Sequence, residues 1–513
     1  MLLSHLLPAL SGATLYGPRA VTEVDITGIA YDSRAVAGGD LFVALPGVHV
    51  DGHRFIAGAV ARGASAVLCQ YPPGDEPPVP HIVVPDARAA MADVAAAFYG
   101  HPSDRLDVVG VTGTDGKTTT SFLLHAVLQG TGRAAALIST VAFRVGDVAW
   151  DNASRQSTPE SPDVQALLAR AVTAGCTHAV VEATSHALML DRLRGCHVDA
   201  GVFTNLTSDH LDFHGTPENY RAAKARLFQG LGHYPKGNIP KGNIKPAAIL
   251  NRDDDAYAYM RDAGAADVTS YGLHPEADVR AHDVAVTAEG IRFRVTAPDG
   301  GHAVTARSPM TGRFNVYNLL AALAYAHTQG IGLEAAAEAL SAAPGVPGRM
   351  RRVDAGQPYT VVVDYAHTPD SLTKVLDELR AVTPGRLIAV FGSAGERDRG
   401  KRPVMGRIAA ERCEAVVLTD EDPRLEDRLT IIEEIAAGAR AAGARDERTL
   451  LLRPDRREAI GTAVRLARPG DTILLAGKGH ESCIIVGTEK TPWDEEGEAR
   501  AAIVADSRRR SKK

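Results

Sequence analysis

The sequence lacks the features that mark membrane, secreted and nucleic-acid-binding proteins. No stretch approaches the ~18 consecutive apolar residues of a membrane span, and the N-terminus has neither a basic segment nor a small-residue cleavage site. The formal net charge of −6 leaves no broad basic surface for nucleic acid or an anionic membrane. We therefore expect a cytoplasmic protein with no membrane span and no nucleic-acid partner.

Cysteine is also scarce. The five cysteines are scattered, odd in number and never spaced as Cys-x-x-Cys. This pattern argues against a zinc site and a disulfide framework, and favours reduced thiols. The content of 45% hydrophobic and 23% charged residues is ordinary for a soluble globular protein. A chain of 513 residues is too long for one core, so we expect several domains.

What the sequence does contain is a glycine-rich turn between a predicted strand and a predicted helix. The apolar run Val108–Val111 predicts a buried strand, and Gly113–Gly116 form the turn. Lys117 and Thr118 follow the second glycine directly. In a phosphate-binding loop such a lysine reaches the terminal phosphates and such a hydroxyl binds Mg²⁺. The first glycine of the strict pattern is replaced, so an ordinary glycine-rich turn is the alternative; the Lys-Thr-Thr that follows favours ATP binding.

Strand and helix patterns alternate along the whole chain and predict an α/β protein with three domains. Residues 1–104 predict a small α/β domain, 105–342 a central P-loop domain with a doubly wound, mainly parallel sheet, and 343–513 a Rossmann-like sheet. Residues 276–308 alternate like antiparallel strands. Residues 235–244 are a tandem five-residue duplication, which predicts a solvated loop insertion.

Polar side chains follow two further apolar runs of the central domain. Glu182 ends one run and would lie on the same sheet edge as the glycine turn, as a magnesium ligand or as a solvated carboxylate. Two Asp and two His lie within residues 209–214, which indicates a metal or acid–base cluster or a polar turn. A helix follows, with Thr216 as its N-cap. From chemistry alone, Lys224 on that helix is a surface lysine or another phosphate contact.

The C-terminal region repeats this arrangement. Charged or glycine-rich clusters follow four predicted strands, at residues 364–367, 392–402, 420–424 and 477–481. Ligands of doubly wound sheets bind beyond the carboxyl ends of the strands. The four clusters therefore predict one ligand-binding rim.

Together these motifs resemble those of the Mur ligases, the ATP-dependent amide-forming enzymes that build the peptidoglycan stem peptide. The resemblance covers nearly the whole chain and is strongest to the members that add the third residue. It is carried by the ATP loop at 112–118, the segment 204–215 with Lys224, the elements 312–318 and 347–349, and the run 364–369. Asp115 stands where Asn is more usual.

The resemblance implies a role for individual residues. ATP would be bound by Gly113, Thr114, Asp115, Gly116, Lys117, Thr118, Thr119, Asn315, Arg349 and Asp364. UDP-N-acetylmuramoyl-L-alanyl-D-glutamate would be bound by Ser33, His49, Val50, Asp51, Ser157, Thr158, Thr184 and Arg192. The incoming amino acid would be held by Arg397, Glu421, Asp422, Pro423, Arg424, Gly477 and Glu481. Lys117, Lys224 and His210 would be catalytic, and Mg²⁺ would be bound by Thr118, Glu182, His210 and Lys224, the last as a carbamate.

The added residue would be a diamino acid, and the sequence leaves its identity open. Family members that add meso-diaminopimelate carry Asp-Asn-Pro-Arg where this chain has residues 421–424, Glu-Asp-Pro-Arg. The retained Arg424 suits the distal carboxylate of diaminopimelate, whereas the additional negative charge suits the distal ammonium of L-lysine or L-ornithine.

Three other activities remain as alternatives. They are a folylpolyglutamate synthase-like ligase, the sibling ligase that adds D-alanyl-D-alanine, and a non-catalytic P-loop nucleotide switch. The first generally lacks the N-terminal domain, the second fits less well at residues 422–424, and the third has no need of Arg397 and Glu481. We expect a monomer.

Overall fold

The computed structural model describes residues 1–18, 23–47, 50–152, 154, 156–207, 209–232, 246–264, 267–287, 289–298 and 301–510. The duplication at 235–244 and His49 lie outside the described residues. The chain divides into two compact units, Met1–Arg280 with Leu320–Ala336 and Ala281–Leu319 with Ala337–Lys513. The three domain boundaries expected from the sequence stay a prediction.

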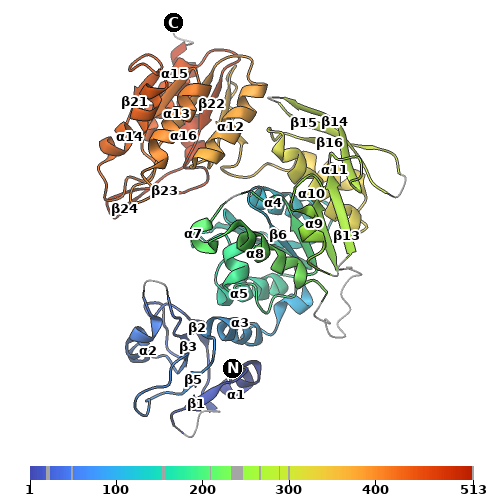
Figure 1. Cartoon of the computed structure of the whole chain (residues 1–513), viewed down its shortest axis with the longest axis vertical. Coiled ribbons are helices and arrows are strands. Elements are labelled where there is room, and N and C mark those ends of the chain that lie inside the picture. Colours follow the sequence, from blue (N-terminus) through green and yellow to red (C-terminus); the bar gives the residue numbers. More distant parts are fainter. Residues whose placement is uncertain are drawn as a thin grey trace. The chain divides into compact units, whose positions relative to one another are not determined.

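The N-terminal part of the first unit is a five-stranded sheet in the order β1-β5-β4-β3-β2, parallel except for β1 (Figure 1). Its strands are β1 Thr14–Tyr16, β2 Gly28–Ala30, β3 Asp40–Val43, β4 Ala66–Cys69 and β5 His81–Val83. Its helices are α1 Leu3–Leu6, α2 Ile56–Ala61 and α3 Ala87–Phe98. Asp86 caps α3 by accepting hydrogen bonds from the N–H groups of Arg88 and Ala89, which fixes where that helix begins.

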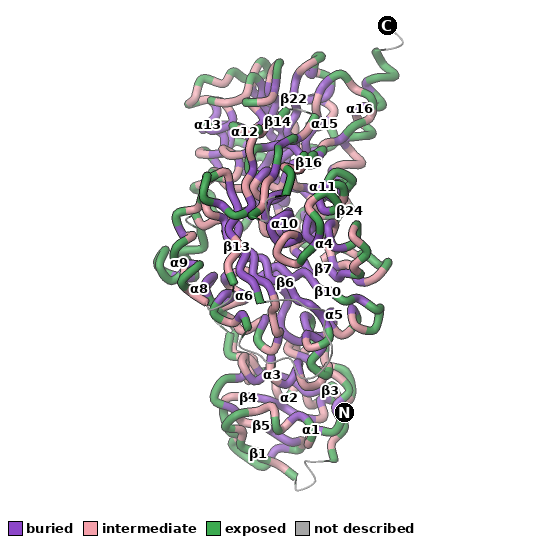
Figure 2. The backbone as a smooth tube through the Cα atoms, turned by 90° about the vertical axis from the view of Figure 1, so that its right-hand side faces the viewer, coloured by how far each residue is buried: buried purple, intermediate pink, exposed green. Residues whose placement is uncertain are grey.

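The central sheet of the first unit has the order β13-β12-β11-β6-β10-β7-β8-β9. Its strands are β6 Asp107–Thr112, β7 Ala135–Ile138, β8 Ala142–Val145, β9 Val148–Asp151, β10 His178–Glu182, β11 Ala200–Phe203, β12 Ala247–Asn251 and β13 Asp267–Gly272. Pairing is parallel from β13 to β7 and antiparallel from β7 to β9. Every residue of β6 and β10 is buried (Figure 2), as expected for strands covered by helices on both faces.

The helices around this sheet are α4 Lys117–Gly130, α5 Ser161–Thr173, α6 Ser185–Met189, α7 Leu211–His214, α8 Pro217–Gln229 and α9 Tyr257–Arg261. Farther along the chain lie α10 Phe314–Thr328 and α11 Leu333–Ala342. The Thr216 hydroxyl accepts a hydrogen bond from the Asn219 N–H and caps α8, with Pro217 in the first turn. The helix start predicted from Thr216 is confirmed.

The segment predicted as antiparallel strands contains β14 Val279–Thr287, β15 Gly290–Thr296 and β16 Val304–Ser308. β15 and β16 form an antiparallel pair, which confirms the prediction for these residues. The first two residues of β14 pair with β13 in parallel. Among the described residues, the β8–β9 hairpin is an element that the sequence analysis did not predict.

The second unit contains a six-stranded sheet in the order β17-β18-β22-β19-β20-β21, parallel except for β17. The strands are β17 Arg351–Arg352, β18 Thr360–Val363, β19 Leu387–Phe391, β20 Ala415–Leu418, β21 Leu450–Leu452 and β22 Thr472–Leu475, followed by the hairpin β23 Cys483–Val486 and β24 Glu489–Pro492. The helices are α12 Pro369–Val382, α13 Lys401–Arg412, α14 Arg428–Ala441, α15 Arg456–Leu466 and α16 Glu495–Arg510.

Two separate apolar clusters lie on the two faces of this second sheet. One contains residues of α12, α13 and α14, such as Leu376, Met405 and Ile435. The other contains residues of α15 and α16, such as Ile460 and Ile503. Helices on both faces make the sheet doubly wound, so the α/β class predicted from the sequence is confirmed. Within the described part of the chain, none of the helices has the length and apolar character needed to cross a membrane.

Candidate active site

The turn between β6 and α4 has the backbone of a phosphate-binding loop. Gly113 and Gly116 have φ values of 149° and 82°, a region that glycine adopts without steric cost. A β-carbon at position 113 would lie 1.9 Å from the Thr204 Oγ1. Because α4 begins at Lys117, its unpaired N–H groups and the positive end of its dipole face the turn. Thr119, in the first turn of α4, is buried.

Residues after β11 fasten this loop. The Thr114 and Asp115 N–H groups donate to the Asn205 carbonyl and Oδ1, at 2.8 and 2.9 Å. In return, Thr204 Oγ1 and Asn205 Nδ2 donate to the Asp115 carbonyl, at 2.6 and 3.1 Å. Because these four hydrogen bonds hold three consecutive peptide groups, they fix the backbone of the loop. The sequence analysis named Thr204 and Asn205 only as part of a family motif and did not predict that they hold the loop.

Two lysines converge on one carbonyl oxygen of the loop. Lys117 Nζ donates to the carbonyls of Gly113 and Thr114, at 3.1 and 2.7 Å. Lys224 Nζ, from α8, donates to the same Gly113 carbonyl at 2.6 Å. Lys224 is 1% exposed, so the alternative of a surface lysine is wrong. Burial, and then the charge of Lys117, hold the pKa of Lys224 well below its usual value.

Glu182 at the end of β10 lies beside the start of α4. Its Oε2 accepts hydrogen bonds from the hydroxyls of Thr118 at 3.2 Å and Thr140 at 2.9 Å, and its Oε1 accepts from the Thr140 N–H at 2.8 Å. The side chain is fully buried, and this burial raises the pKa of Glu182 despite the nearby Lys117. The alternative of a solvated carboxylate is therefore wrong. Thr118 and Glu182 present two hard oxygen donors of the kind that Mg²⁺ prefers.

At the Asp–His segment 209–214, after β11, histidine rings lie together rather than carboxylates. The ring of His186 lies 4.7 Å from that of His210 and 5.5 Å from that of His214. Burial, and the neighbouring His210 and His214, lower the pKa of His186 to about 4. His210 has a left-handed backbone, and its Nε2 is 3.4 Å from Asp209 Oδ2. Among the described residues, no group of three or more His, Cys, Asp or Glu side chains is arranged to hold a metal ion.

The residues assigned to the muramoyl dipeptide meet around the backbone of Glu182. Thr158 Oγ1 donates to the Glu182 carbonyl at 2.6 Å and lies 3.3 Å from Thr184 Oγ1. Arg192 donates to the Thr158 carbonyl at 3.0 Å. Ser157, beside Thr158, is partly buried.

The residues assigned to the uridine nucleotide lie in the N-terminal part. Ser33 is partly buried and Val50 is 51% exposed. Asp51 accepts hydrogen bonds from the His53 N–H at 3.0 Å, and its carboxylate lies 2.6 Å from His53 Nδ1.

In the second unit, Asn315 and Asp364, two of the residues assigned to ATP, are buried and hydrogen-bonded. Asn315 donates to the Thr311 carbonyl at 2.7 Å and accepts from Asn318 at 2.8 Å. Asp364, after β18, accepts from the N–H groups of Met350 and Ala366, each at 2.8 Å. Burial raises the pKa of Asp364, although Arg349 opposes this shift.

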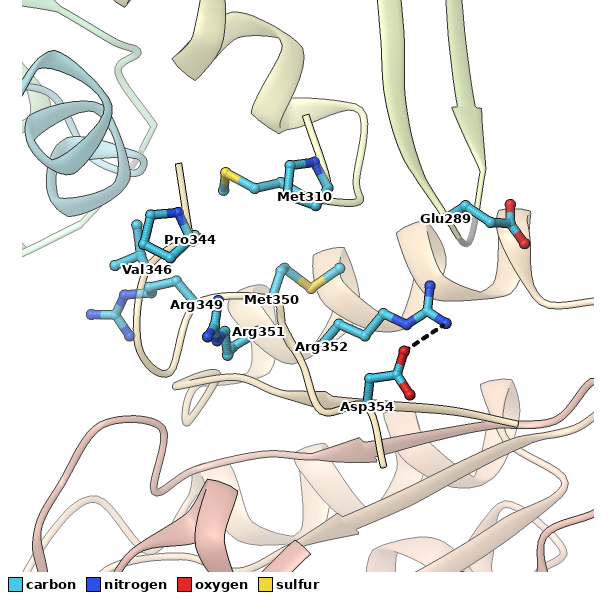
Figure 3. A pocket seen from close by; sticks show the side chains of 11 residues that line it. Glu289, Met310, Pro344, Val346, Arg349, Met350, Arg351, Arg352 and Asp354 are labelled. Atoms are coloured by element: carbon cyan, nitrogen blue, oxygen red, sulfur yellow. Dashed lines mark ion pairs between the residues drawn. The ribbon is translucent and has the colours of Figure 1, made fainter. Parts of the chain in front are cut away.

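Arg349 lies over the ring of Tyr365, 4.6 Å from its centroid. It also lines a cavity of about 270 Å³ in the second unit, in which its side chain and that of Arg352 extend in opposite directions (Figure 3). The cavity is lined by Glu289, Pro309, Met310, Pro344, Gly345, Val346, Arg349, Met350, Arg351, Arg352 and Asp354. Of these lining residues, Arg349 is the one assigned to a ligand from the sequence.

The amino-acid rim is organised by a lysine that the sequence analysis did not single out. Lys478 Nζ is fully buried and donates to Asp422 Oδ1 at 2.8 Å and to Glu481 Oε2 at 2.7 Å. Asp422 Oδ1 also accepts from the Ile485 N–H at 3.0 Å. Asp422 and Glu481 therefore share the one positive charge of Lys478.

Of the other rim residues, Gly477 lies beside Glu421. Glu421 is 7% exposed, and its Oε2 is buried without a hydrogen-bond partner. That oxygen would lie 3.1 Å from a β-carbon at Gly477, which has φ 99°. Arg424 has a left-handed backbone, held by its N–H donating to the Ile485 carbonyl. Arg397 is exposed in the segment before α13, and Pro423 is buried.

Three family models match the chain. The Mur ligase family catalytic domain matches residues 25–99, the Mur ligase middle domain 111–326, and the Mur ligase glutamate ligase domain 348–479.

Individual relatives match along almost their whole length. The chain is 54% identical over 484 residues to the UDP-N-acetylmuramyl-tripeptide synthetase of Roseiflexus sp., covering 93% of this chain and 94% of that protein. It is 42% identical over 479 residues to the UDP-N-acetylmuramoyl-L-alanyl-D-glutamate–2,6-diaminopimelate ligase of Geobacillus kaustophilus, covering 93% and 95%. A solved structure of a ligase with that second name superposes with a TM-score of 0.67 at 31% identity and covers 99% of both chains. The chain belongs to the Mur ligase family.

Proposed function

We propose that this protein is an ATP-dependent ligase that adds a diamino acid to the D-glutamate of UDP-N-acetylmuramoyl-L-alanyl-D-glutamate, in peptidoglycan synthesis. The observation that carries the proposal is the glycine turn with Lys117 at its end and the buried Thr118–Glu182 pair beside it. It is supported by relatives of 42% and 54% identity that are named for this step.

Magnesium would be held by the Thr118 hydroxyl and the Glu182 carboxylate, where it would neutralise phosphate charge. Lys117 donates to two neutral carbonyls. Phosphate oxygens are stronger acceptors for an ammonium group. ATP would therefore draw Lys117 away from those carbonyls, and the N–H groups at the start of α4 would bind phosphate.

The reaction joins two steps. The γ-carboxylate oxygen of the D-glutamate takes the γ-phosphoryl group of ATP, and ADP leaves. The amine of the diamino acid then attacks the acyl-phosphate carbon, inorganic phosphate leaves, and the amine loses its proton. The protein contributes positive charge where two anions must meet and holds the amine near the acyl group.

Lys224 would act as a carbamate. Its lowered pKa makes the neutral amine available, and its nitrogen would form a bond to CO₂ with release of one proton. The two ammonium groups that now share the Gly113 carbonyl would become an oppositely charged pair. Carbamate oxygens are also hard ligands, which would bind a second Mg²⁺ together with His210.

For the added residue we propose meso-diaminopimelate. Asp422 is 4% exposed and its Oδ1 is engaged by Lys478 and by the Ile485 N–H, so that oxygen is not available to a distal ammonium. Glu421 keeps one unpaired buried oxygen, and Arg424 follows three residues later. A carboxylate and a guanidinium match the distal end of diaminopimelate, which carries both an ammonium and a carboxylate. L-Lysine and L-ornithine lack the carboxylate.

The test is phosphate release from the purified protein with ATP, Mg²⁺ and the UDP-muramoyl dipeptide, supplied in turn with diaminopimelate, lysine and ornithine. We expect release with the dipeptide and the highest kcat/KM for diaminopimelate. A higher kcat/KM for lysine or ornithine would overturn the assignment of the added residue and leave the ligase. No release with any of the three would overturn the ligase and favour a nucleotide switch.

Cytoplasmic location and a monomeric state are part of the proposal. ATP is a cytoplasmic co-substrate, which supports the location. Size-exclusion chromatography with light scattering gives the mass directly, and a mass near 54.1 kDa is expected for the monomer.

A further inference from the structure

Glu160 is a buried carboxylate shared by two arginines from distant parts of the chain. It is 6% exposed and directly precedes α5. Its Oε2 lies 3.0 Å from the NH1 of Arg88, near the start of α3, and its Oε1 lies 3.0 Å from the NH2 of Arg192. The three side chains carry a net charge of +1 in a mostly buried position. Such an imbalance favours an additional anion nearby.

A continuous set of contacts leads from this cluster to the start of α4. Arg192 NH1 donates to the Thr158 carbonyl at 3.0 Å, and Thr158 Oγ1 donates to the Glu182 carbonyl at 2.6 Å. The carboxylate of Glu182 accepts from Thr118. Arg192 therefore lies between Glu160 and the backbone of the candidate magnesium ligand.

Arg192 also keeps a donor for a ligand. Its Nε is buried and has no hydrogen-bond partner, although NH1 and NH2 are both engaged. The D-glutamyl end of the substrate carries two carboxylates. One of them would pair with this donor and complete the charge balance of the cluster.

We infer that Arg88 and Glu160 are positioning residues that hold Arg192 in place to bind the peptide end of the UDP-muramoyl dipeptide. This inference rests on the proposed function. Arg88 acts through Glu160, because it takes one of the two carboxylate oxygens and leaves a single oxygen for Arg192. Without Arg88, both oxygens of Glu160 would be open to Arg192, and its guanidinium would no longer be held in one orientation toward the substrate carboxylate.

A second ion pair provides a matched control. Arg194 Nε and NH2 lie 2.8 and 2.9 Å from the two carboxylate oxygens of Asp93. Asp93 is on α3, as Arg88 is, and Arg194 lies two residues after Arg192. This pair joins α3 to the segment that carries Arg192 and is more exposed, at 47% and 27% for its side chains. A role limited to docking α3 would make the losses of Asp93 and Arg88 equivalent.

The experiment compares Arg88→Ala, Arg88→Lys, Glu160→Gln and Asp93→Ala with the wild type. Phosphate release is measured while the dipeptide, ATP and the diamino acid are varied in turn. We expect Arg88→Ala and Glu160→Gln to raise the KM for the dipeptide about tenfold, with the KM for ATP changed less than about twofold. Arg88→Lys should restore part of the loss, and Asp93→Ala should leave all three KM values near wild type.

The inference is overturned if Arg88→Ala leaves the KM for the dipeptide unchanged, or if Asp93→Ala raises it equally. If Arg88→Ala does not fold, the KM for the dipeptide of Glu160→Gln and Arg88→Lys is compared with the wild type and with Asp93→Ala instead. A wild-type protein that releases no phosphate with the dipeptide overturns the proposed function and this inference with it. Wild-type release combined with equal effects of the α3 variants overturns this inference alone.

Discussion

Two buried titratable side chains of opposite type lie at the candidate site. Lys224 is buried as a base and Glu182 as an acid, and burial moves the pKa of the first down and that of the second up. In both cases burial disfavours the charged form of the side chain. The dependence of the free energy of unfolding on pH therefore contains a separate contribution from each residue.

Lys224→Met should reduce the change of the free energy of unfolding with pH. Because the pKa of Lys224 is lowered from 10.5 in the folded state, the unfolded state binds more protons between the two values. The free energy of unfolding therefore rises with pH in that interval. Urea unfolding at a series of pH values below 10.5, in CO₂-free buffer, should show a smaller rise for Lys224→Met than for the wild type. The exposed Lys490→Met is the control, and equal slopes for all three proteins would refute the prediction.

Glu182→Gln should abolish activity without loss of stability. The raised pKa means that the ionised carboxylate destabilises the folded state, increasingly as the pH rises above its ordinary value of 4.5. The amide removes this charge, so the Tm without nucleotide should equal or exceed that of the wild type. Phosphate release should fall by about 10²-fold or more, and Mg²⁺–ATP should raise the Tm of the wild type alone. Activity within tenfold of wild type would contradict the assignment.

Several residues of the site could be predicted because their signal is local. Lys117 and Thr118 follow two glycines within a strand–turn–helix pattern, and that order alone indicates phosphate binding. Thr140, Lys478 and Arg88 could not be found this way. They meet Glu182, Asp422 and Glu160, which are 42, 56 and 72 residues away along the chain. Such pairs depend on how strands are ordered in the sheet, which local spacing does not encode.

Among the elements, α15 and α16 are joined by two arginine–glutamate pairs that differ in burial. Arg456 and Glu495 have side chains 1% and 0% exposed, whereas the Arg457 side chain is 69% exposed beside Glu498. Arg456 also donates to the carbonyls of Asp420 and Ala476, at 2.9 and 2.8 Å. Those residues follow β20 and β22, so the buried pair stabilises the rim that carries Glu421 and Gly477.

Arg456→Met should therefore destabilise the protein by about 3–5 kcal/mol, because it leaves the Glu495 charge buried and unpaired. Arg457→Met removes the exposed pair between the same helices and should cost less than about 1 kcal/mol. The double variant Arg456→Met, Glu495→Met should recover part of the loss. Urea unfolding of the four proteins measures these values, and similar costs for the two single variants would refute the argument.

The elements themselves were predicted to different degrees. α8 begins where Thr216 and Pro217 indicated, since a cap is a local feature. The hairpin of β8 and β9 has strands of four residues each. A run so short shows little periodicity, so it was missed.

For the molecule as a whole, the prediction of reduced thiols can be tested directly. Cys69, Cys176 and Cys196 are buried, Cys413 and Cys483 are partly buried, and none of these five described residues forms a disulfide. Burial raises the pKa of Cys69 to about 11 and that of Cys196 to about 12. Since the thiolate is the reactive form, a thiol reagent should react slowly with the native protein and with five groups in denaturant. The Tm should be the same with and without reductant; a Tm lowered by reductant would contradict this.

The class of the whole fold could be predicted because the alternation of strands and helices extends over hundreds of residues. The two units are each built from parallel strands flanked by helices, as that alternation indicates. What the sequence did not reveal is the set of ion pairs that fasten one part to another, such as Arg88–Glu160 and Asp422–Lys478.

The contacts between the N-terminal part and the central sheet limit how this protein can be recombined with its relatives. Tyr31 donates to Asp163 at 2.5 Å, and Arg88 and Asp93 pair with Glu160 and Arg194. A chimera that exchanges residues 1–104 must therefore bring side chains at positions 31, 88 and 93 that are compatible with Asp163, Glu160 and Arg194. Exchanging the N-terminal part between relatives therefore requires matched charges across this contact as well as a suitable junction in the sequence.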